Sequence, residues 1–178
     1  MKTICSYLVG TLVMTAAFAT PARAETLFVP WLGVNTGGTA STSVNFGATI
    51  GGTLHGVLGA DLDAGYSPGF FGNGLNSRVV TVMGNATVGI PFDGAQRAGL
   101  RPYVTAGLGV VHASVEAPLL DTTISHTNLG VNAGGGVMAF WGRHLGVRAD
   151  LRYIRSLDDA NSIDSVRFWR TSFGVTLR

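Results

Sequence analysis

The strongest constraint on this chain is an alternation of side-chain type with a period of two residues. Between Ser43 and Gly51, larger apolar residues alternate with small or polar ones. Successive side chains of a strand point to opposite faces, so this period predicts a β-strand whose faces meet different surroundings. The segment is also rich in glycine, which costs a helix about 1 kcal/mol per interior position relative to alanine. The order of residues therefore excludes a long helix here.

The same alternation recurs along the chain and predicts eight antiparallel strands. We expect them at residues 26–35, 43–52, 56–66, 78–90, 101–112, 125–138, 144–155 and 167–177. Short connections near 53–55 and 140–143 alternate with longer ones near 36–42, 67–77, 113–124 and 156–166, although the 91–100 connection is longer than this scheme prefers. Short turns at one rim and long loops at the other are typical of outer-membrane barrels. We predict an all-β fold, an eight-stranded antiparallel up-and-down transmembrane β-barrel.

Charged residues and glycines share one face of several predicted strands. Glycine makes room inside a narrow barrel, and an arginine on the lipid face at the bilayer midplane would cost about 2 to 4 kcal/mol. The charged face is therefore expected to line the lumen. Three acidic and three basic residues would form a neutral network there: Asp61, Asp63, Arg148, Asp150, Arg152 and Arg170. The alternative is that these charges lie on the wet face of a soluble sheet, which would leave open strand edges.

The first residues have the composition of an export signal. Lys2 precedes an apolar stretch from Ile4 to Phe18, and Ala22-Arg23-Ala24 offers small residues for cleavage. Cleavage after Ala24 would divide the chain into a signal peptide, residues 1–24, and an outer-membrane β-barrel domain, residues 25–178. The alternative is a retained N-terminal anchor helix, for which the apolar stretch is short.

The charge of the mature chain is balanced. Lys2 and Arg23 are two of the 12 Lys and Arg residues, so removing the signal leaves 10 arginines against 10 acidic residues. The chain therefore lacks the basic excess that attracts nucleic acid. Cys5 is the only cysteine and leaves with the signal, so no disulfide can stabilise the mature domain.

Aromatic residues gather near the ends of the predicted strands, as in the interfacial girdles of membrane barrels. One rim is expected to hold Phe28, Phe92, Tyr103, Phe140 and Trp141, and the other Tyr66, Tyr153, Phe168 and Trp169. The long loops also contain apolar residues. Candidates for exposed contacts are Phe70, Phe71, Leu119 and Leu120, with packing on the rim as the alternative.

Three segments resemble the outer-membrane β-barrel domain family, the small barrels similar to OmpA and its porin-like and opacity-protein relatives. They are Arg101 to Val110, Asn132 to Val137 and Leu145 to Tyr153. The resemblance covers essentially the whole mature chain. It implies a monomer in a bacterial outer membrane, in contact with outer-membrane lipids and lipopolysaccharide, and delivered by the barrel-assembly machinery. Family members usually end on an aromatic residue that this machinery reads, whereas this chain ends on Arg178.

No catalytic or metal site is indicated. A lipid A deacylase needs a His-x-Ser pair on one strand, but the stretch from Ser125 to Asn128 places an amide where the nucleophile should be. The four histidines lack metal-ligand spacing, although His112, His126 and Glu116 flank one predicted loop. We therefore expect neither metal nor cofactor.

The resemblance is specific for architecture and uninformative for activity, because relatives include structural anchors, adhesins and small pores. A soluble carrier of lipocalin type would have an apolar inner face, which the charged inner set argues against. We predict a non-enzymatic outer-membrane protein, structural or surface-binding, with a largely plugged polar lumen. A lipid A-modifying, deacylase-like enzyme and a small low-conductance pore are the alternatives.

Overall fold

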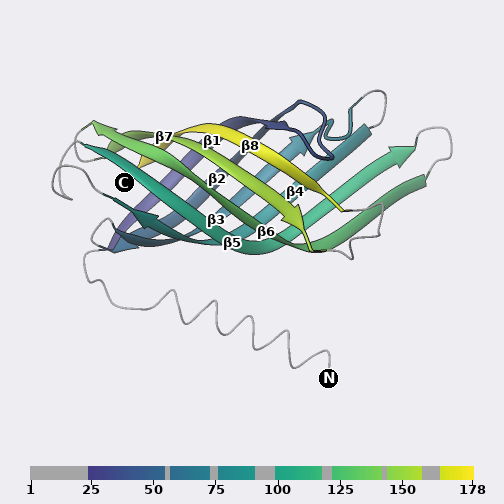
Figure 1. Cartoon of the computed structure of the whole chain (residues 1–178). Coiled ribbons are helices and arrows are strands. Elements are labelled where there is room, and N and C mark those ends of the chain that lie inside the picture. Colours follow the sequence, from purple (N-terminus) through teal and green to yellow (C-terminus); the bar gives the residue numbers. More distant parts are fainter. Residues whose placement is uncertain are drawn as a thin grey trace, which may run out of the picture.

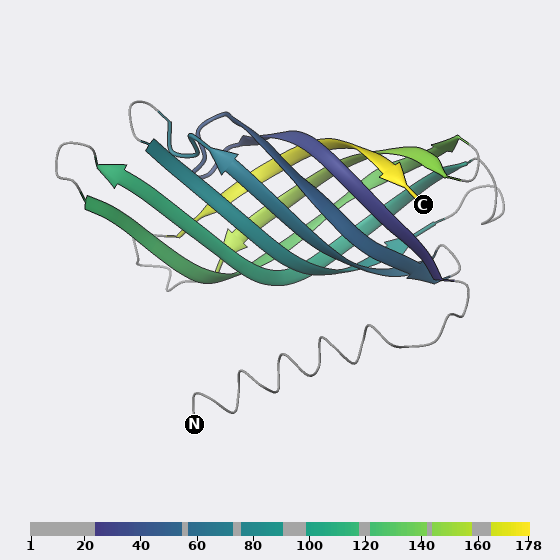
Figure 2. The same ribbon diagram turned by 180° about the vertical axis from the view of Figure 1, so that it is seen from behind.

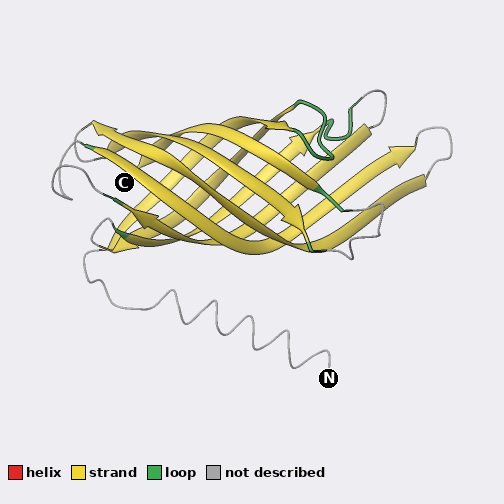
Figure 3. Cartoon of the chain, viewed as in Figure 1, coloured by secondary structure: helices red, strands yellow, loops and turns green. Residues whose placement is uncertain are grey.

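The chain folds into one closed barrel of eight strands (Figure 1). The computed structural model describes residues 24–54, 57–72, 76–90, 99–117, 122–141, 144–157 and 165–178. Within those ranges no helix is long and apolar enough to cross a membrane. Figure 3 shows strands over most of the described chain, joined by short loops. Each strand pairs antiparallel with its neighbour in sequence, and β1 closes the ring against β8. The predicted fold class is confirmed.

The strand bounds follow the predicted pattern closely except in one hairpin. The strands are β1 (Ala24–Thr36), β2 (Ser43–Leu54), β3 (Leu58–Pro68), β4 (Asn76–Gly89), β5 (Leu100–Ala117), β6 (Thr122–Trp141), β7 (Leu145–Ser156) and β8 (Arg167–Leu177). The long loop predicted for residues 113–124 is wrong, because pairing of β5 with β6 continues to Ala117 and Thr122. β-Branched residues such as Val115 and Ile124, which lie opposite each other, favour the strand there.

The two ends of the barrel differ in which parts of the chain lie there. β1 begins and β8 ends at the same end, on the left of Figure 1 and on the right of Figure 2, and we call it the terminal end. At the opposite end, which we call the loop end, β1, β3, β5 and β7 end and β2, β4, β6 and β8 begin. In outer-membrane barrels the longer connections face the outside of the cell. The first of these connections turns through Gly37 and Gly38, whose positive φ angles of 73° and 63° suit glycine.

Side chains alternate between a lipid-facing outer surface and the lumen. On the outer surface, Leu108 and Phe173 are 69% and 67% exposed, whereas Asp63 and Arg152 in the lumen are each 1% exposed. In β4 and β7 the alternation runs along the whole strand. The apolar surface is therefore outside and the charged surface inside, as in a membrane barrel and opposite to a soluble β-protein.

Part of the predicted aromatic girdle is wrong. Tyr103, Phe140 and Phe168 are buried, because each lies on the face of its strand that points into the lumen. Proximity to a strand end does not decide the direction of a side chain, whereas the parity of its position does. On the outer face, Tyr153 contacts Trp169 with ring centroids 5.1 Å apart. The remaining members of the two predicted rims are Phe28, Trp141 and Tyr66, which are exposed or half-buried, and Phe92, which lies outside the described residues.

Glycine leaves space for a large inward ring at Gly47. A Cβ atom added there would lie 2.9 Å from Cε2 of the Trp31 indole and would also collide with the Ala64 carbonyl oxygen. At Gly84, in contrast, the nearest atom to an added Cβ is the Leu108 carbonyl oxygen, at 3.8 Å. Gly47 is therefore a packing requirement, and Gly84 is not.

We predict that Gly47→Ala lowers the free energy of unfolding by about 1–3 kcal/mol, because overpacking displaces Trp31 and the β3 backbone. The matched control, Gly84→Ala, should change it by less than about 0.5 kcal/mol. Urea unfolding of the refolded barrel in detergent micelles, followed by tryptophan fluorescence, measures both. Equal midpoints for the two variants would contradict the prediction.

Candidate functional site in the barrel lumen

The structure places the six charged residues expected in the lumen on the inner faces of β3, β7 and β8. Period two brings Arg148, Asp150 and Arg152 onto one face of β7, so an acid stands between two bases. β3 contributes two aspartates in the same way. Arg170 comes from β8, which lies next to β7 and is separated from β3 by β1 and β2 in the closed ring. The six side chains therefore converge from opposite walls of one narrow space.

The first part of the network joins β3 to β8 across the lumen. Arg170 Nη2 lies 2.6 Å from Asp63 Oδ1, and both side chains are almost completely buried. Thr49 on β2 donates its hydroxyl proton to the other Asp63 oxygen at 2.8 Å. The Arg170 guanidinium also lies over the Trp31 indole, 4.3 Å from the ring centroid. Both charges therefore have partners on other strands, which offsets part of the cost of burying ions.

The second part is centred on Asp150. Arg152 Nε donates to Asp150 Oδ1 at 2.7 Å, and Arg148 Nη2 donates to Asp150 Oδ2 at 3.2 Å. Tyr103 on β5 donates its hydroxyl proton to the same Asp150 oxygen. The Tyr103 oxygen in turn accepts a hydrogen bond from Arg148 Nε at 2.6 Å. The Asp150 carboxylate thus binds two guanidinium groups of its own strand and the Tyr103 phenol of β5.

Asp61 takes a less central place in the network. Its oxygens accept hydrogen bonds from Asn85 Nδ2 at 2.6 Å and Thr87 Oγ1 at 3.2 Å, both from β4. Arg148 Nη2 approaches Asp61 only to 3.9 Å. A small cavity of about 20 Å³ beside Asp61 and Arg148 is large enough for one water molecule. Asp61 is therefore held mainly by neutral amide and hydroxyl groups.

An apolar cluster fills the lumen at the loop end. Seven buried side chains form it: Phe70, Val79, Met83, Val111, Ile154, Val166 and Phe168. Phe70 and Phe168 pack edge to face with ring centroids 4.9 Å apart. The expectation that Phe70 is an exposed loop contact is wrong, because its exposed fraction is 0% and its ring turns into the barrel mouth. Phe71 is half-buried against the same cluster, and Leu119 and Leu120 lie outside the described residues.

A mixed cluster occupies the terminal end of the lumen. Phe140 packs there with Leu27 and Met138, below Tyr103. Two arginine guanidinium groups lie over the Phe140 ring, Arg178 at 3.8 Å and Arg101 at 5.1 Å from its centroid. Both guanidinium groups also contact the Glu25 carboxylate, Arg178 at 3.0 Å and Arg101 at 3.4 Å. Arg178 thus helps to fill the terminal end of the lumen through an aromatic ring and an ion pair.

The sequence pattern does not identify all the partners that connect these layers. Tyr103 was assigned to the girdle, although it shares a strand face with Arg101 and Thr105. That shared parity is the signal that would have placed it in the lumen. The Thr49 and Asn85 partners have no such signal, because the facing residue depends on the register between strands.

The histidines are not assembled into a catalytic or metal site within the described residues. No group of three metal-ligating side chains occurs there. His112 Nδ1 lies 2.7 Å from Thr127 Oγ1 across the β5–β6 hairpin. His112 belongs to the set of alternate residues of β5 that faces away from the lumen. His126 and Asn128 belong to the same hairpin.

Comparisons with known proteins agree with this architecture. A family model described as "Outer membrane protein beta-barrel domain" matches residues 9–178. The chain belongs to this family. Its family and its barrel imply residence in a bacterial outer membrane, in a lipid and lipopolysaccharide environment. No curated protein matches the sequence.

Solved outer-membrane barrels share the fold at low sequence identity. Neisserial surface protein A has a TM-score of 0.67 and 16% identity over 86% of this chain and 97% of its own. The N-terminal β-barrel domain of Pseudomonas aeruginosa OprF has a TM-score of 0.60 and 19% identity over 87% of this chain and 98% of its own. Ail, the attachment invasion locus protein of Yersinia pestis, has a TM-score of 0.54 and 10% identity over 86% of this chain and 97% of its own. These likenesses show the fold.

We predict that Asp63→Asn lowers the free energy of unfolding by about 3–5 kcal/mol, because it leaves the Arg170 charge buried without its partner. The double variant Asp63→Asn with Arg170→Met should lower the free energy of unfolding by less than Asp63→Asn alone, because it removes the charge left without a partner. Glu25→Gln serves as the comparison, because the Glu25 side chain is 30% exposed, and it should cost less than Asp63→Asn. A double variant as unstable as the sum of its single variants would contradict a direct pairing.

Proposed function

We propose that this protein is a non-enzymatic outer-membrane barrel, structural or surface-binding, whose polar lumen is largely plugged. The observation that carries the proposal is the filling of the lumen at three successive levels by the chain's own side chains. The apolar cluster lies at the loop end, the charged network in the middle, and the Phe140 cluster at the terminal end. Eight strands enclose a space that side chains can just fill, in contrast to the channels of larger porins.

The charges in the middle level favour a plug over a selectivity filter. Asp63, Asp150 and Asp61 face Arg170, Arg152 and Arg148, so neither sign is in excess. Paired ions of opposite charge hold each other in place, whereas an ion-selective pore usually presents a ring of one sign. The protein therefore acts through its outer wall and its loop end, which are the surfaces that the plug leaves available.

The maturation of the chain is part of the proposal. Residues 1–24 act as an export signal removed after Ala24, and residues 25–178 form the barrel domain. The barrel-assembly machinery inserts it as a monomer. The composition of the first residues supports this order, because a charged start, an apolar stretch and small residues before the cut are the parts of a secretory signal.

We predict that the wild-type protein shows at most small and infrequent openings in planar-bilayer recordings. Arg148→Ala should raise the open probability and also lower resistance to unfolding, because it leaves Asp150 with one guanidinium partner fewer. Arg78→Ala is the matched control, because Arg78 is exposed on the outside of β4 and should leave conductance unchanged. Sustained large currents through the wild-type protein would overturn the plugged lumen.

We predict that lipid A is chemically unchanged by this protein. Mass spectrometry of lipid A from cells with and without the protein should show the same acyl chains, because Asn128 stands where a deacylase needs its nucleophile. A loss or gain of an acyl chain that His126→Ala abolishes would instead establish the lipid A-modifying enzyme.

A further inference from the structure

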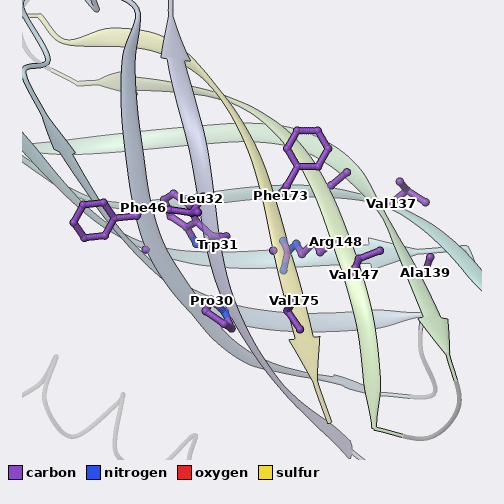
Figure 4. A pocket seen from close by; sticks show the side chains of 13 residues that line it. Pro30, Trp31, Leu32, Phe46, Val137, Ala139, Val147, Arg148, Phe173 and Val175 are labelled. Carbon is purple, nitrogen blue, oxygen red and sulfur yellow. The ribbon is translucent and has the colours of Figure 1, made fainter.

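An apolar groove crosses the outer wall where the barrel closes. It has a volume of about 740 Å³ and runs over β1, β8, β7 and the adjoining parts of β2 and β6. Figure 4 shows Leu32, Phe173, Val175 and Val147 around it. Ala139 and Ala149 are small outward residues of the same lining. The volume falls within the range of small-molecule sites, and most of the lining side chains belong to the lipid-facing surface.

The groove coincides with an interruption in strand pairing. β1 pairs with β8 at Phe28 and Leu177 and again from Trp31 and Gly174 onward, but Val29 and Pro30 have no β8 partner in the register. The other seven neighbouring strand pairs are continuous over the described residues. Proline lacks the N–H group that a strand offers its neighbour, which accounts for a local gap. At this place the outer wall therefore has a groove, and the pairing of β1 with β8 is interrupted.

A basic pair lies farther along the same two strands, toward the loop end. Arg155 of β7 and Arg167 of β8 are directly opposite each other, and both side chains are exposed on the outer face. Like charges in facing positions destabilise a sheet unless a counter-charge joins them. Within the described part of the chain, no ion pair links either arginine to a carboxylate.

The backbone holds this basic pair in a fixed position. Ser156 N donates to the Val166 carbonyl oxygen at 2.8 Å, and Val166 N donates to Ser156 Oγ at 3.0 Å, so the hairpin stays paired beyond the arginines. Thr39 of the β1–β2 connection donates its backbone N–H to the Arg167 carbonyl oxygen at 2.8 Å. Its hydroxyl oxygen accepts the Arg167 N–H at 3.0 Å. The Arg167 backbone is thus hydrogen-bonded to Thr39 on one side and paired with β7 on the other.

The basic pair and the groove are arranged like the two ends of a lipid. Tyr153 and Trp169, the next outward pair below the arginines, form part of the aromatic girdle that marks the membrane interface. From Arg167 to Phe173, at the edge of the groove, the path along β8 is about 20 Å at 3.3 Å per residue. Guanidinium groups above the girdle suit a phosphate, and an apolar groove below it suits a hydrocarbon chain.

We infer that the β7–β8–β1 wall is a binding site for a phosphate-bearing lipid of the outer leaflet. Arg155 and Arg167 bind its headgroup phosphate, and an acyl chain lies in the groove over the interrupted seam. Continuity of the groove with the lipid-facing surface identifies the occupant, because membrane lipid is what covers this surface. The inference goes beyond the proposed function and does not depend on whether the lumen conducts.

The experiment uses the refolded barrel in phosphatidylcholine nanodiscs with added bisphosphorylated lipid A, and native mass spectrometry to measure the lipid retained. We expect phosphorylated lipid A to be retained in preference to lipid A stripped of its phosphates. Arg155→Gln and Arg167→Gln should each weaken retention about fivefold, the effect of one arginine at a charged membrane surface. Ala149→Trp, which fills the groove, should weaken retention while preserving the preference for phosphate.

Matched controls lie on the other side of the barrel. Arg78→Gln removes an exposed outer arginine of β4, and Leu108→Trp adds a ring to the lipid face of β5, so neither should alter retention. Heat-dependent gel migration reports for every variant whether the barrel is folded. Equal retention by the wild type and by the double arginine variant would overturn the inference. So would equal retention of phosphate-free lipid A, or displacement of the lipid by inorganic phosphate at the same concentration, which would indicate a simple anion site.

Discussion

In the hydrocarbon of a membrane no water is available to a backbone N–H or C=O group, and this constraint governs the whole molecule. A sheet satisfies it only by closing on itself, because an open edge would leave a row of unpaired groups in lipid. Here β1 meets β8 and the ring is complete. Closure with eight strands then fixes the width of the interior, so every inward residue must fit a space whose size is already set. For this reason a Cβ atom fits at the outward glycine Gly84 but not at the inward glycine Gly47.

The interior meets that requirement with different chemistry at different depths. At the loop end, Phe70 folds back from a connection and packs on Phe168, so an apolar cluster separates the charged network from the outside. Deeper in the barrel, burial makes each charge costly, and the cost is offset because Asp63 and Asp150 have guanidinium partners at hydrogen-bond distance. Tyr103 joins this network to the terminal end, where Phe140 lies between arginines. Side chains at each level therefore pack through a different kind of contact.

The period of two was enough to predict the barrel, the inward face of the six residues of the charged network and the neutral balance of those six, because parity alone decides those features. It was not enough to pair Asp63 with Arg170, which are 107 residues apart and meet only through the curvature and register of the closed ring. Tyr103 and Phe168 were misplaced where nearness to a strand end was preferred to parity. Phe70 was misplaced because a loop residue has no periodicity from which its direction follows. The β5–β6 hairpin is longer than predicted, because β5 and β6 stay paired through Val115 and Ile124. The polar residues around these two positions had suggested a loop.

The interrupted seam between β1 and β8 has a consequence for the lifetime of the folded state. Pairing of Phe28 with Leu177 closes a loop of about 150 residues, so this contact has the largest entropic cost of formation and comes late in folding. Neighbouring hairpins are local and can form earlier. The strand pair that completes the ring is also the pair weakened at Pro30. We therefore expect opening of the barrel to begin at this junction, and the rate of unfolding to depend more on this strand pair than on the average of the eight.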